Sequence, residues 1–256
     1  MESLKNIIVF ISGASSGIGK SCAYAFAKKG ANLIINARRI NIINEIADDL
    51  RAKFGIKVYA FKLDVRNKPE VDAAINSLPD EWKNIDLLIN NAGLARGFEK
   101  FYEDDPQNWE EMIDTNIKGL LYVTHQILPG MIERGFGHII NIGSIAGHMA
   151  YPKGAVYCAT KHAVDAITNS LRMDTLDKGI LVSTIDPGMV ETNFSNIRFG
   201  DTEKAKNVYK GLTPLTGDDV AEAVLFCASR PPHVNIAEMT LLASTQANGM
   251  MVYRKE

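Results

Sequence analysis

Short apolar runs recur along this chain, and each is followed by a longer segment with helical periodicity. The runs are IIVFIS (7–12), NLIINA (32–37), KVYAFKLD (57–64), IDLLIN (85–90), HIINIGS (138–144) and ILVSTID (180–186). Amphipathic stretches such as GKSCAYAFAKKG and NEIADDLRAKF lie between them. Strands that are apolar on both faces and alternate with helices are typical of a parallel sheet covered on both sides. Right-handed crossovers then predict a doubly wound α/β sheet.

The pattern continues along the chain without a repeat or a linker. With 256 residues, of which 46% are hydrophobic, the chain can bury a substantial core, and we expect one domain over residues 1–256. One region, at about 188–217, is irregular because Gly, Pro, Thr and Asn interrupt it. Long irregular segments inside compact domains are often active-site lids, so we interpret this region as lid-like.

Charge and cysteine usage restrict the partners and the compartment. The formal net charge is -2, which favours neither nucleic acid nor an anionic membrane as a partner. Cys22, Cys158 and Cys227 form no CxxC pair, which suits a reducing compartment, and we interpret Cys158 as a packing residue. The apolar run near the start is too short for a signal peptide or a membrane span. These features predict a cytoplasmic protein.

Three glycines follow the first predicted strand and open a helix in the stretch SGASSGIGK. Gly13, Gly17 and Gly19 would allow a tight turn and a close approach to a pyrophosphate, which the N–H groups at a helix N-terminus attract. The spacing is G-x3-G-x-G rather than G-x-G-x-x-G, but the position between strand and helix indicates a dinucleotide site. The alternative is a plain helix cap.

Two arginines stand after the second strand, where an NAD site of this layout usually has an acidic residue for the ribose hydroxyls. Arg38 and Arg39 could instead bind a 2′-phosphate, which a carboxylate would repel. The pair therefore predicts NADP rather than NAD. The alternative is that both arginines only solvate the start of the next helix, although helix N-termini prefer acidic residues.

Tyr157 and Lys161 lie four residues apart in VYCATKHAV, and at helical spacing they share one face. A nearby ammonium favours the phenolate, so we expect Lys161 to lower the pKa of Tyr157 toward a value useful for proton transfer. The alternative for this pair alone is a half-buried ring beside a surface lysine.

Together with the glycine loop, LDV (63–65), NNAG (90–93), Asn116, Ser144 and the Tyr157–Lys161 pair, the chain resembles the short-chain dehydrogenase/reductase family over nearly its whole length. The resemblance implies a Rossmann-type fold with seven parallel strands, hydride transfer at a nicotinamide, and a homo-oligomer, here expected as a homotetramer. The tail AEMTLLASTQANGMMVY would supply the seventh strand and a subunit contact. Ser12 replaces the usual threonine before Gly13 but keeps the hydroxyl.

The resemblance also implies roles for individual residues around the cofactor. Asp64 would meet the adenine amino group, Asn91 would lie on the adenosine side, and PGMVET (187–192) would pass over the nicotinamide. No metal is expected. The implied cofactor-binding set is Gly13, Ser15, Ser16, Gly17, Ile18, Gly19, Arg38, Arg39, Asp64, Val65, Asn91, Ala92, Gly93, Tyr157, Lys161, Pro187, Gly188, Val190 and Thr192.

Carbonyl reduction needs a proton donor and a hydrogen bond to the substrate oxygen. Tyr157 would exchange the proton, Ser144 would polarise the oxygen, and Lys161 would also bind the nicotinamide ribose. Asn116 would help to hold a water that links Lys161 to solvent. The alternatives are that Ser144 caps the next turn and that Asn116 bonds a helix backbone.

Longer stretches, including ETNFSNIRFGD and PPHVNIAEMTLLASTQ, are similar to NADP-dependent 3-hydroxy acid dehydrogenases, also described as serine or allo-threonine dehydrogenases and malonic semialdehyde reductases. Serine, allo-threonine, 3-hydroxypropionate and 3-hydroxyisobutyrate are the expected substrate types. A cation must hold the substrate carboxylate, and Arg198 in the lid-like segment is the first candidate. Arg96, His148 and Lys153 are the others.

Two other functions are open at this level. A reductase of 3-oxoacyl groups on a carrier protein or thioester would use the same chemistry. A redox-sensing module that holds NADP without turnover belongs to a different class, and the intact set of Ser144, Tyr157 and Lys161 argues against it.

Overall fold

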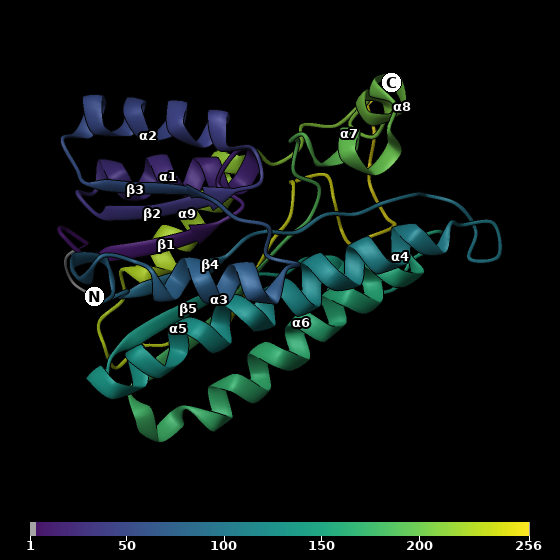
Figure 1. Cartoon of the computed structure of the whole chain (residues 1–256). Helices are drawn as coiled ribbons and strands as arrows, with labels where there is room; N and C mark the ends of the chain where they lie inside the picture. Colours follow the sequence, from purple (N-terminus) through teal and green to yellow (C-terminus); the bar gives the residue numbers. More distant parts are fainter. Residues whose placement is uncertain (1–3, 256) are drawn as a thin grey trace.

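The computed structural model describes residues 4–255, and its strands form one parallel seven-stranded sheet (Figure 1). The spatial order is β3-β2-β1-β4-β5-β6-β7. The strands are β1 (Ile8–Ser12), β2 (Asn32–Ala37), β3 (Val58–Lys62), β4 (Leu87–Asn90), β5 (Gly137–Ile142), β6 (Ile180–Pro187) and β7 (Glu238–Leu241). The predicted doubly wound sheet is confirmed, and the seventh strand lies in the apolar tail.

Two strands end before their apolar runs do. The run 57–64 forms a strand only to Lys62, because its last partner in β2 is Ala37, where β2 itself ends. The run 138–144 leaves the sheet after Ile142, whose partner is Ile185. Residues beyond these points turn outward at the carboxyl end of the sheet, where ligands bind in open α/β folds.

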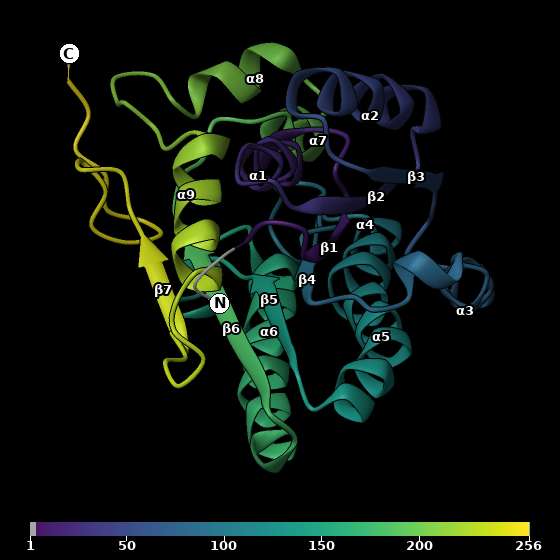
Figure 2. The same cartoon turned by 90° about the vertical axis from the view of Figure 1, so that its left-hand side faces the viewer.

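Helices cover both faces of the sheet, with α1, α2 and α9 on one side and α3, α5 and α6 on the other (Figure 2). Alternate residues of β1 pack into the apolar clusters on the two faces of the sheet, because successive side chains along a strand point to opposite faces. Ile11 belongs to the apolar cluster that contains Phe26 of α1, whereas Phe10 belongs to the cluster that contains Val123 of α5. The helices are α1 (Gly17–Lys28), α2 (Ile40–Phe54), α3 (Lys68–Asn76), α4 (Pro106–Ile113), α5 (Leu120–Arg134), α6 (Ala155–Asp174), α7 (Phe194–Phe199), α8 (Thr202–Asn207) and α9 (Gly217–Ala228).

Four shorter helical turns join these elements within residues 4–255. They are the 3₁₀ turns η1 (Asp80–Trp82), η3 (Ile145–Gly147) and η4 (Leu176–Lys178), and a π-helical turn, η2 (Asp114–Gly119), between α4 and α5. The three cysteines are buried free thiols, and Cys158 packs against an apolar cluster that includes Met112 and Tyr157. Its interpretation as a packing residue is confirmed. Between residues 4 and 255, no helix is both long and apolar enough to cross a bilayer.

The lid-like segment 188–217 is more ordered than its composition suggests. It contains α7 and α8, which lie away from the main body of the sheet (Figure 1). Asp201 caps α8 by accepting hydrogen bonds from the backbone N–H groups of Glu203 and Lys204. Tyr209 ties the segment together, because its hydroxyl donates to the Val190 carbonyl at 2.8 Å and contacts the Ser195 hydroxyl at 2.7 Å. These short capping signals are hidden among turn-forming residues in the sequence.

Candidate active site

A cavity of about 830 Å³ opens at the carboxyl end of the sheet, between the glycine loop and α7. Nearly all predicted site residues line it, although they come from segments far apart in the chain. All predicted site residues lie within the described residues 4–255, and all of them except Gly19 and Asn116 line this cavity. The predicted residues that line it are Gly13, Ser15, Ser16, Gly17, Ile18, Arg38, Arg39, Asp64, Val65, Asn91, Ala92, Gly93, Ser144, Tyr157, Lys161, Pro187, Gly188, Val190, Thr192 and Arg198.

The three loop glycines serve two structural purposes. Gly13 and Gly17 have φ values of +69° and +55°, which side-chain-bearing residues rarely adopt. Gly19 has ordinary dihedrals, but a Cβ there would collide with the Asn91 amide. That amide donates to the carbonyls of Ser12 at 2.9 Å and Gly13 at 3.1 Å, so Asn91 fastens the loop to the end of β4. Its predicted contact on the adenosine side stays a prediction.

The N-terminus of α1 faces the cavity beside the two predicted arginines. Ser16, at the N-cap, does not cap the helix with its hydroxyl, which instead accepts from Arg39 Nη2 at 2.9 Å. The same Arg39 nitrogen donates to the Ser15 hydroxyl at 2.9 Å. Arg38 is exposed and lines the cavity next to this cluster. Guanidinium groups, hydroxyls and free helix N–H groups therefore gather in one place, which is a setting that attracts phosphate.

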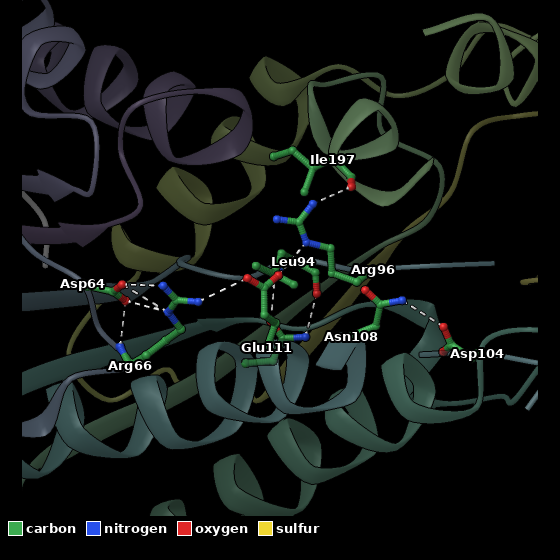
Figure 3. A network of polar contacts seen from close by, with 9 residues as sticks. Asp64, Arg66, Leu94, Arg96, Asp104, Asn108, Glu111 and Ile197 are labelled. Carbon is green, nitrogen blue, oxygen red and sulfur yellow. Dashed lines mark hydrogen bonds and ion pairs between the residues drawn. The ribbon is translucent and has the colours of Figure 1, made fainter. Parts of the chain in front are cut away.

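Asp64 lines the cavity, but its carboxylate is engaged within the protein. Arg66 donates from Nη2 to Asp64 Oδ2 at 2.6 Å and from Nε to Oδ1 at 2.9 Å (Figure 3). Burial opposes ionisation of Asp64, but the hydrogen bonds and charge of Arg66 outweigh it and lower the pKa of the carboxyl. Asp64 is thus held as an ionised acceptor, and its contact with an adenine amino group stays a prediction.

Ser144 lies at the end of β5, where η3 begins. Its backbone N–H donates to Asp186 Oδ1 at 3.0 Å, and its hydroxyl accepts from the Ala146 N–H at 3.1 Å. The capping role that the sequence left open is therefore present. The same side chain lines the cavity, so capping orients the hydroxyl without removing it from the site.

Tyr157 and Lys161 share a face of α6 as predicted, and both are buried, with exposed fractions of 8% each. The Lys161 ammonium lies 6.0 Å from the Tyr157 ring centroid and donates to the Ile142 carbonyl at 2.8 Å. Burial lowers the pKa of Lys161 to about 8. It raises the pKa of Tyr157, although a hydrogen bond from Ser144 and the charge of Arg198 act in the opposite direction.

The expected lowering of the tyrosine pKa by Lys161 is therefore wrong. Desolvation disfavours a charged phenolate more than the available cations favour it. Sequence spacing identified a cation beside the phenol but could not report how deeply both groups are buried. At neutral pH the phenol is protonated, which is the form that donates a proton.

Asn116 sits in the π-helical turn η2 and is almost fully buried. Its Oδ1 accepts from the Leu94 N–H at 2.9 Å, and its Nδ2 donates to the Leu94 carbonyl at 2.8 Å and to Thr160 Oγ1 at 3.0 Å. The main-chain bond that the sequence left open is present, although it is made to the segment after β4 rather than to a helix. A water held by Asn116 stays a prediction.

Arg198 points into the cavity from α7 and is not a solvated loop residue. Its guanidinium carbon lies 5.5 Å from the Tyr157 ring centroid and 4.8 Å from that of Phe98. Its Nη1 donates to the Tyr151 hydroxyl at 3.0 Å and its Nε to the Gly97 carbonyl at 3.2 Å. Of the five N–H donors of a guanidinium, the hydrogen bonds among residues 4–255 use two.

The other three candidates for binding a substrate carboxylate, Arg96, His148 and Lys153, do not line the cavity. Arg96 forms an ion pair with Glu111 at 2.6 Å. His148 lies 3.2 Å from Asp186 Oδ2, and Lys153 is exposed with its ammonium 5.6 Å from the Phe98 ring centroid. The structure thus separates Arg198 from the other three.

Several residues of the cavity wall were missed in the sequence. Tyr151 and Phe98 flank Arg198, and Phe194 packs edge-on against Tyr157 with ring centroids 5.6 Å apart. Gln246 comes from the tail and accepts a hydrogen bond from Met189 N at 2.9 Å, which fixes the turn after β6. The spacing of Phe194, Ile197 and Arg198 in α7 was the available signal for an inward-facing helix.

Comparison with known proteins agrees with this geometry. Residues 7–202 match the short chain dehydrogenase family. The chain is 44% identical over 258 residues to the NADP-dependent 3-hydroxy acid dehydrogenase of Schizosaccharomyces pombe, covering 100% of both chains. It is 44% identical over 252 residues to the enzyme of the same name from Escherichia coli K12, covering 97% of this chain and 100% of that one.

A solved structure described as the closed form of serine dehydrogenase complexed with NADP+ superposes with a TM-score of 0.90. That protein is 42% identical to this chain, and the match covers 98% of this chain and 100% of the other. The matched region includes the glycine loop and the Tyr157–Lys161 pair. This chain belongs to the short-chain dehydrogenase family.

Proposed function

We propose that the protein transfers a hydride between NADP(H) and a small 3-hydroxy acid or the corresponding semialdehyde or 3-oxo acid. The observation that carries the proposal is Arg198, a cation placed inside the cavity over the ring of the predicted proton donor Tyr157. The names of the similar proteins from Schizosaccharomyces pombe and Escherichia coli support the same substrate class.

The residues present fit an NADP cofactor. The glycine loop admits a close backbone approach, and the α1 N-terminus offers N–H groups that the Ser16 hydroxyl does not cap. Arg38 and Arg39 would hold a 2′-phosphate together with Ser15. The NADP+ complex of the similar serine dehydrogenase supports this assignment. When bound, the nicotinamide supplies or accepts the hydride.

The chain's own groups supply the remaining chemistry. In reduction, the Tyr157 hydroxyl donates its proton to the substrate oxygen, while Ser144 donates a hydrogen bond that stabilises the developing negative charge. The charge of Arg198 favours the phenolate of Tyr157 that this step leaves behind. The same arginine would hold the substrate carboxylate in bidentate fashion with its remaining donors.

A substrate screen tests the proposed function. NADP reduction should be measured with serine, allo-threonine, 3-hydroxypropionate and 3-hydroxyisobutyrate, and NADPH oxidation with matched 3-oxo acids and thioesters. We expect turnover of free acids in preference to thioesters, because a carboxylate can pair with Arg198 and a thioester cannot. A preference for thioesters would favour the 3-oxoacyl reductase, and absence of turnover with every carbonyl compound would contradict the proposal.

Arg198→Ala should raise KM for 3-hydroxy acids and leave KM for an uncharged alcohol almost unchanged. Loss of one charge-assisted interaction costs about 1.5 to 3 kcal/mol, so KM should rise by about one to two powers of ten. Steady-state kinetics on both substrate types provide the comparison. An equal rise in KM for charged and uncharged substrates would mean that Arg198 only supports α7. An unchanged KM would contradict its role in binding.

We also propose a cytoplasmic homotetramer built from single-domain chains. The free cysteines support a reducing compartment. Apolar side chains exposed on α9 and the tail, including Phe226, Met250 and Met251, support a subunit contact. Light scattering at micromolar concentration should give about four times the chain mass of 28.1 kDa. A monomer under these conditions would contradict the oligomer.

A further inference from the structure

Arg96 joins two parts of the molecule that are distant in the sequence. Its Nε pairs with Glu111 Oε2 of α4 at 2.6 Å, and its Nη1 donates to the Ile197 carbonyl of α7 at 3.1 Å (Figure 3). The side chain is 34% exposed and so lies in a partly desolvated contact. One guanidinium thus ties the segment after β4 to a helix about a hundred residues later in the chain.

The contact matters for α7 because this helix has only six residues. The last carbonyls of a helix have no partner within it and need donors from elsewhere. Arg96 supplies the donor for Ile197, and the Gly97 N–H supplies the donor for the Arg198 carbonyl at 3.1 Å. In return, Arg198 Nε donates to the Gly97 carbonyl at 3.2 Å. The final turn of α7 is therefore seated on residues 96–97.

Glu111 orients the planar guanidinium group of Arg96. Its Oε2 contacts Arg96, while its Oε1 lies 3.4 Å from Arg66 Nη1, and Arg66 is paired in turn with Asp64 (Figure 3). The Glu111 side chain is 25% exposed. With one edge of the guanidinium held by the carboxylate, the other edge faces the Ile197 carbonyl.

We propose that Arg96 and Glu111 are positioning residues that hold α7 so that Arg198 stays over the Tyr157 ring. The inference rests on the proposed function, since it assigns Arg198 to the substrate carboxylate. Arg96 contacts neither the cavity nor Tyr157, so its effect passes through Ile197 and the adjacent Arg198. Displacing α7 would weaken binding of a charged substrate without removing a reacting group.

Arg96→Lys is the sharpest variant, because lysine keeps a charge for Glu111 but lacks the planar fork that also reaches Ile197. We expect KM for the best 3-hydroxy acid to rise about threefold to tenfold, the range for one lost hydrogen bond. We expect kcat, NADPH affinity and KM for an uncharged alcohol to change less than about twofold. Glu111→Gln should show the same selective rise.

A double-mutant cycle tests whether the two residues act as a unit. If they do, Arg96→Ala combined with Glu111→Ala should raise KM for the acid no more than Arg96→Ala alone. Arg51→Lys is the matched control, because Arg51 also joins a carboxylate, Asp48, to a main-chain carbonyl, Val58. The contacts of Arg51 lie within α2 and between α2 and β3. Arg51→Lys should therefore leave KM for the acid unchanged.

Amide hydrogen exchange gives a readout that does not depend on the substrate. Exchange at 194–200 should become faster in Arg96→Ala and stay unchanged in Arg51→Ala. Unchanged exchange at 194–200 in Arg96→Ala would overturn the inference. An unchanged KM for the acid in Arg96→Lys would also overturn it, provided that Arg198→Ala raises this KM. If the native enzyme shows no turnover of hydroxy acids, the proposed function fails, and the exchange result alone then decides whether Arg96 positions α7.

Discussion

Tyr157→Phe is expected to lower turnover by at least about two powers of ten, the usual scale for a lost general acid. The phenol is buried and burial raises its pKa, so it is protonated near neutral pH and ready to donate. Phenylalanine keeps the ring that packs against Phe194, so the fold and NADPH binding should remain. Single-turnover kinetics with NADPH, together with fluorescence titration of the cofactor, measure both effects.

Tyr24→Phe is the matched control for this variant. It also removes a phenol hydroxyl, which in Tyr24 donates to Asp49 of α2, and neither of these two residues lines the cavity. Its turnover should stay near the native value. Turnover near the native value in Tyr157→Phe would remove this residue from the mechanism, whereas loss of NADPH binding in that variant would indicate a structural role.

Replacing Arg38 and Arg39 together with glutamine should weaken NADPH binding far more than NADH binding. Each charge-assisted bond to a 2′-phosphate contributes about 1.5 to 3 kcal/mol, so two of them correspond to between about two and four powers of ten in Kd. Both side chains are exposed at the cavity edge, and water and salt reduce the effect toward the lower end. Titration with each cofactor measures the difference.

Lys28→Gln with Lys29→Gln makes the same change in net charge at the opposite end of α1. This control should leave the affinities for NADPH and NADH unchanged. It separates direct binding of the phosphate by the arginines from the effect of the protein's net charge. Equal weakening of NADPH and NADH in the arginine variant would mean that Arg39 serves the loop through Ser15 and Ser16 rather than the phosphate.

The alternation of apolar runs with amphipathic segments was enough to predict six strands of the sheet and their parallel arrangement, whereas the seventh strand was expected only from the family resemblance. Periodicity is a local property, because each strand or helix must carry its own apolar face wherever it packs. The glycine loop and the Tyr157–Lys161 pair were predictable for the same reason, since strand-to-helix position and i to i+4 spacing are visible along the chain. Strand ends were less predictable, because they depend on where the neighbouring strand stops.

The environment of the catalytic candidates came only from the tertiary structure. Lys161 looked like the cation that would lower the Tyr157 pKa, but burial of the phenol raises that pKa instead. Burial depends on every element that surrounds a residue, and spacing within one helix does not report it. The Tyr157 ring centroid also lies closer to the Arg198 guanidinium carbon, at 5.5 Å, than to the Lys161 ammonium, at 6.0 Å. Spacing within α6 could not show this contact, because Arg198 belongs to α7.

The choice among four cationic candidates for the carboxylate was also a tertiary matter. Arg96 and Arg198 both stood near expected loops in the sequence, but Glu111 pairs with Arg96 and orients it toward Ile197, while Arg198 enters the cavity. The bond from Arg96 to Ile197 spans 101 positions. The sequence by itself determined the elements and the local chemistry that each one carries. Only the fold decided which charges meet, because ion pairs and desolvation depend on neighbours that the chain brings together over long separations.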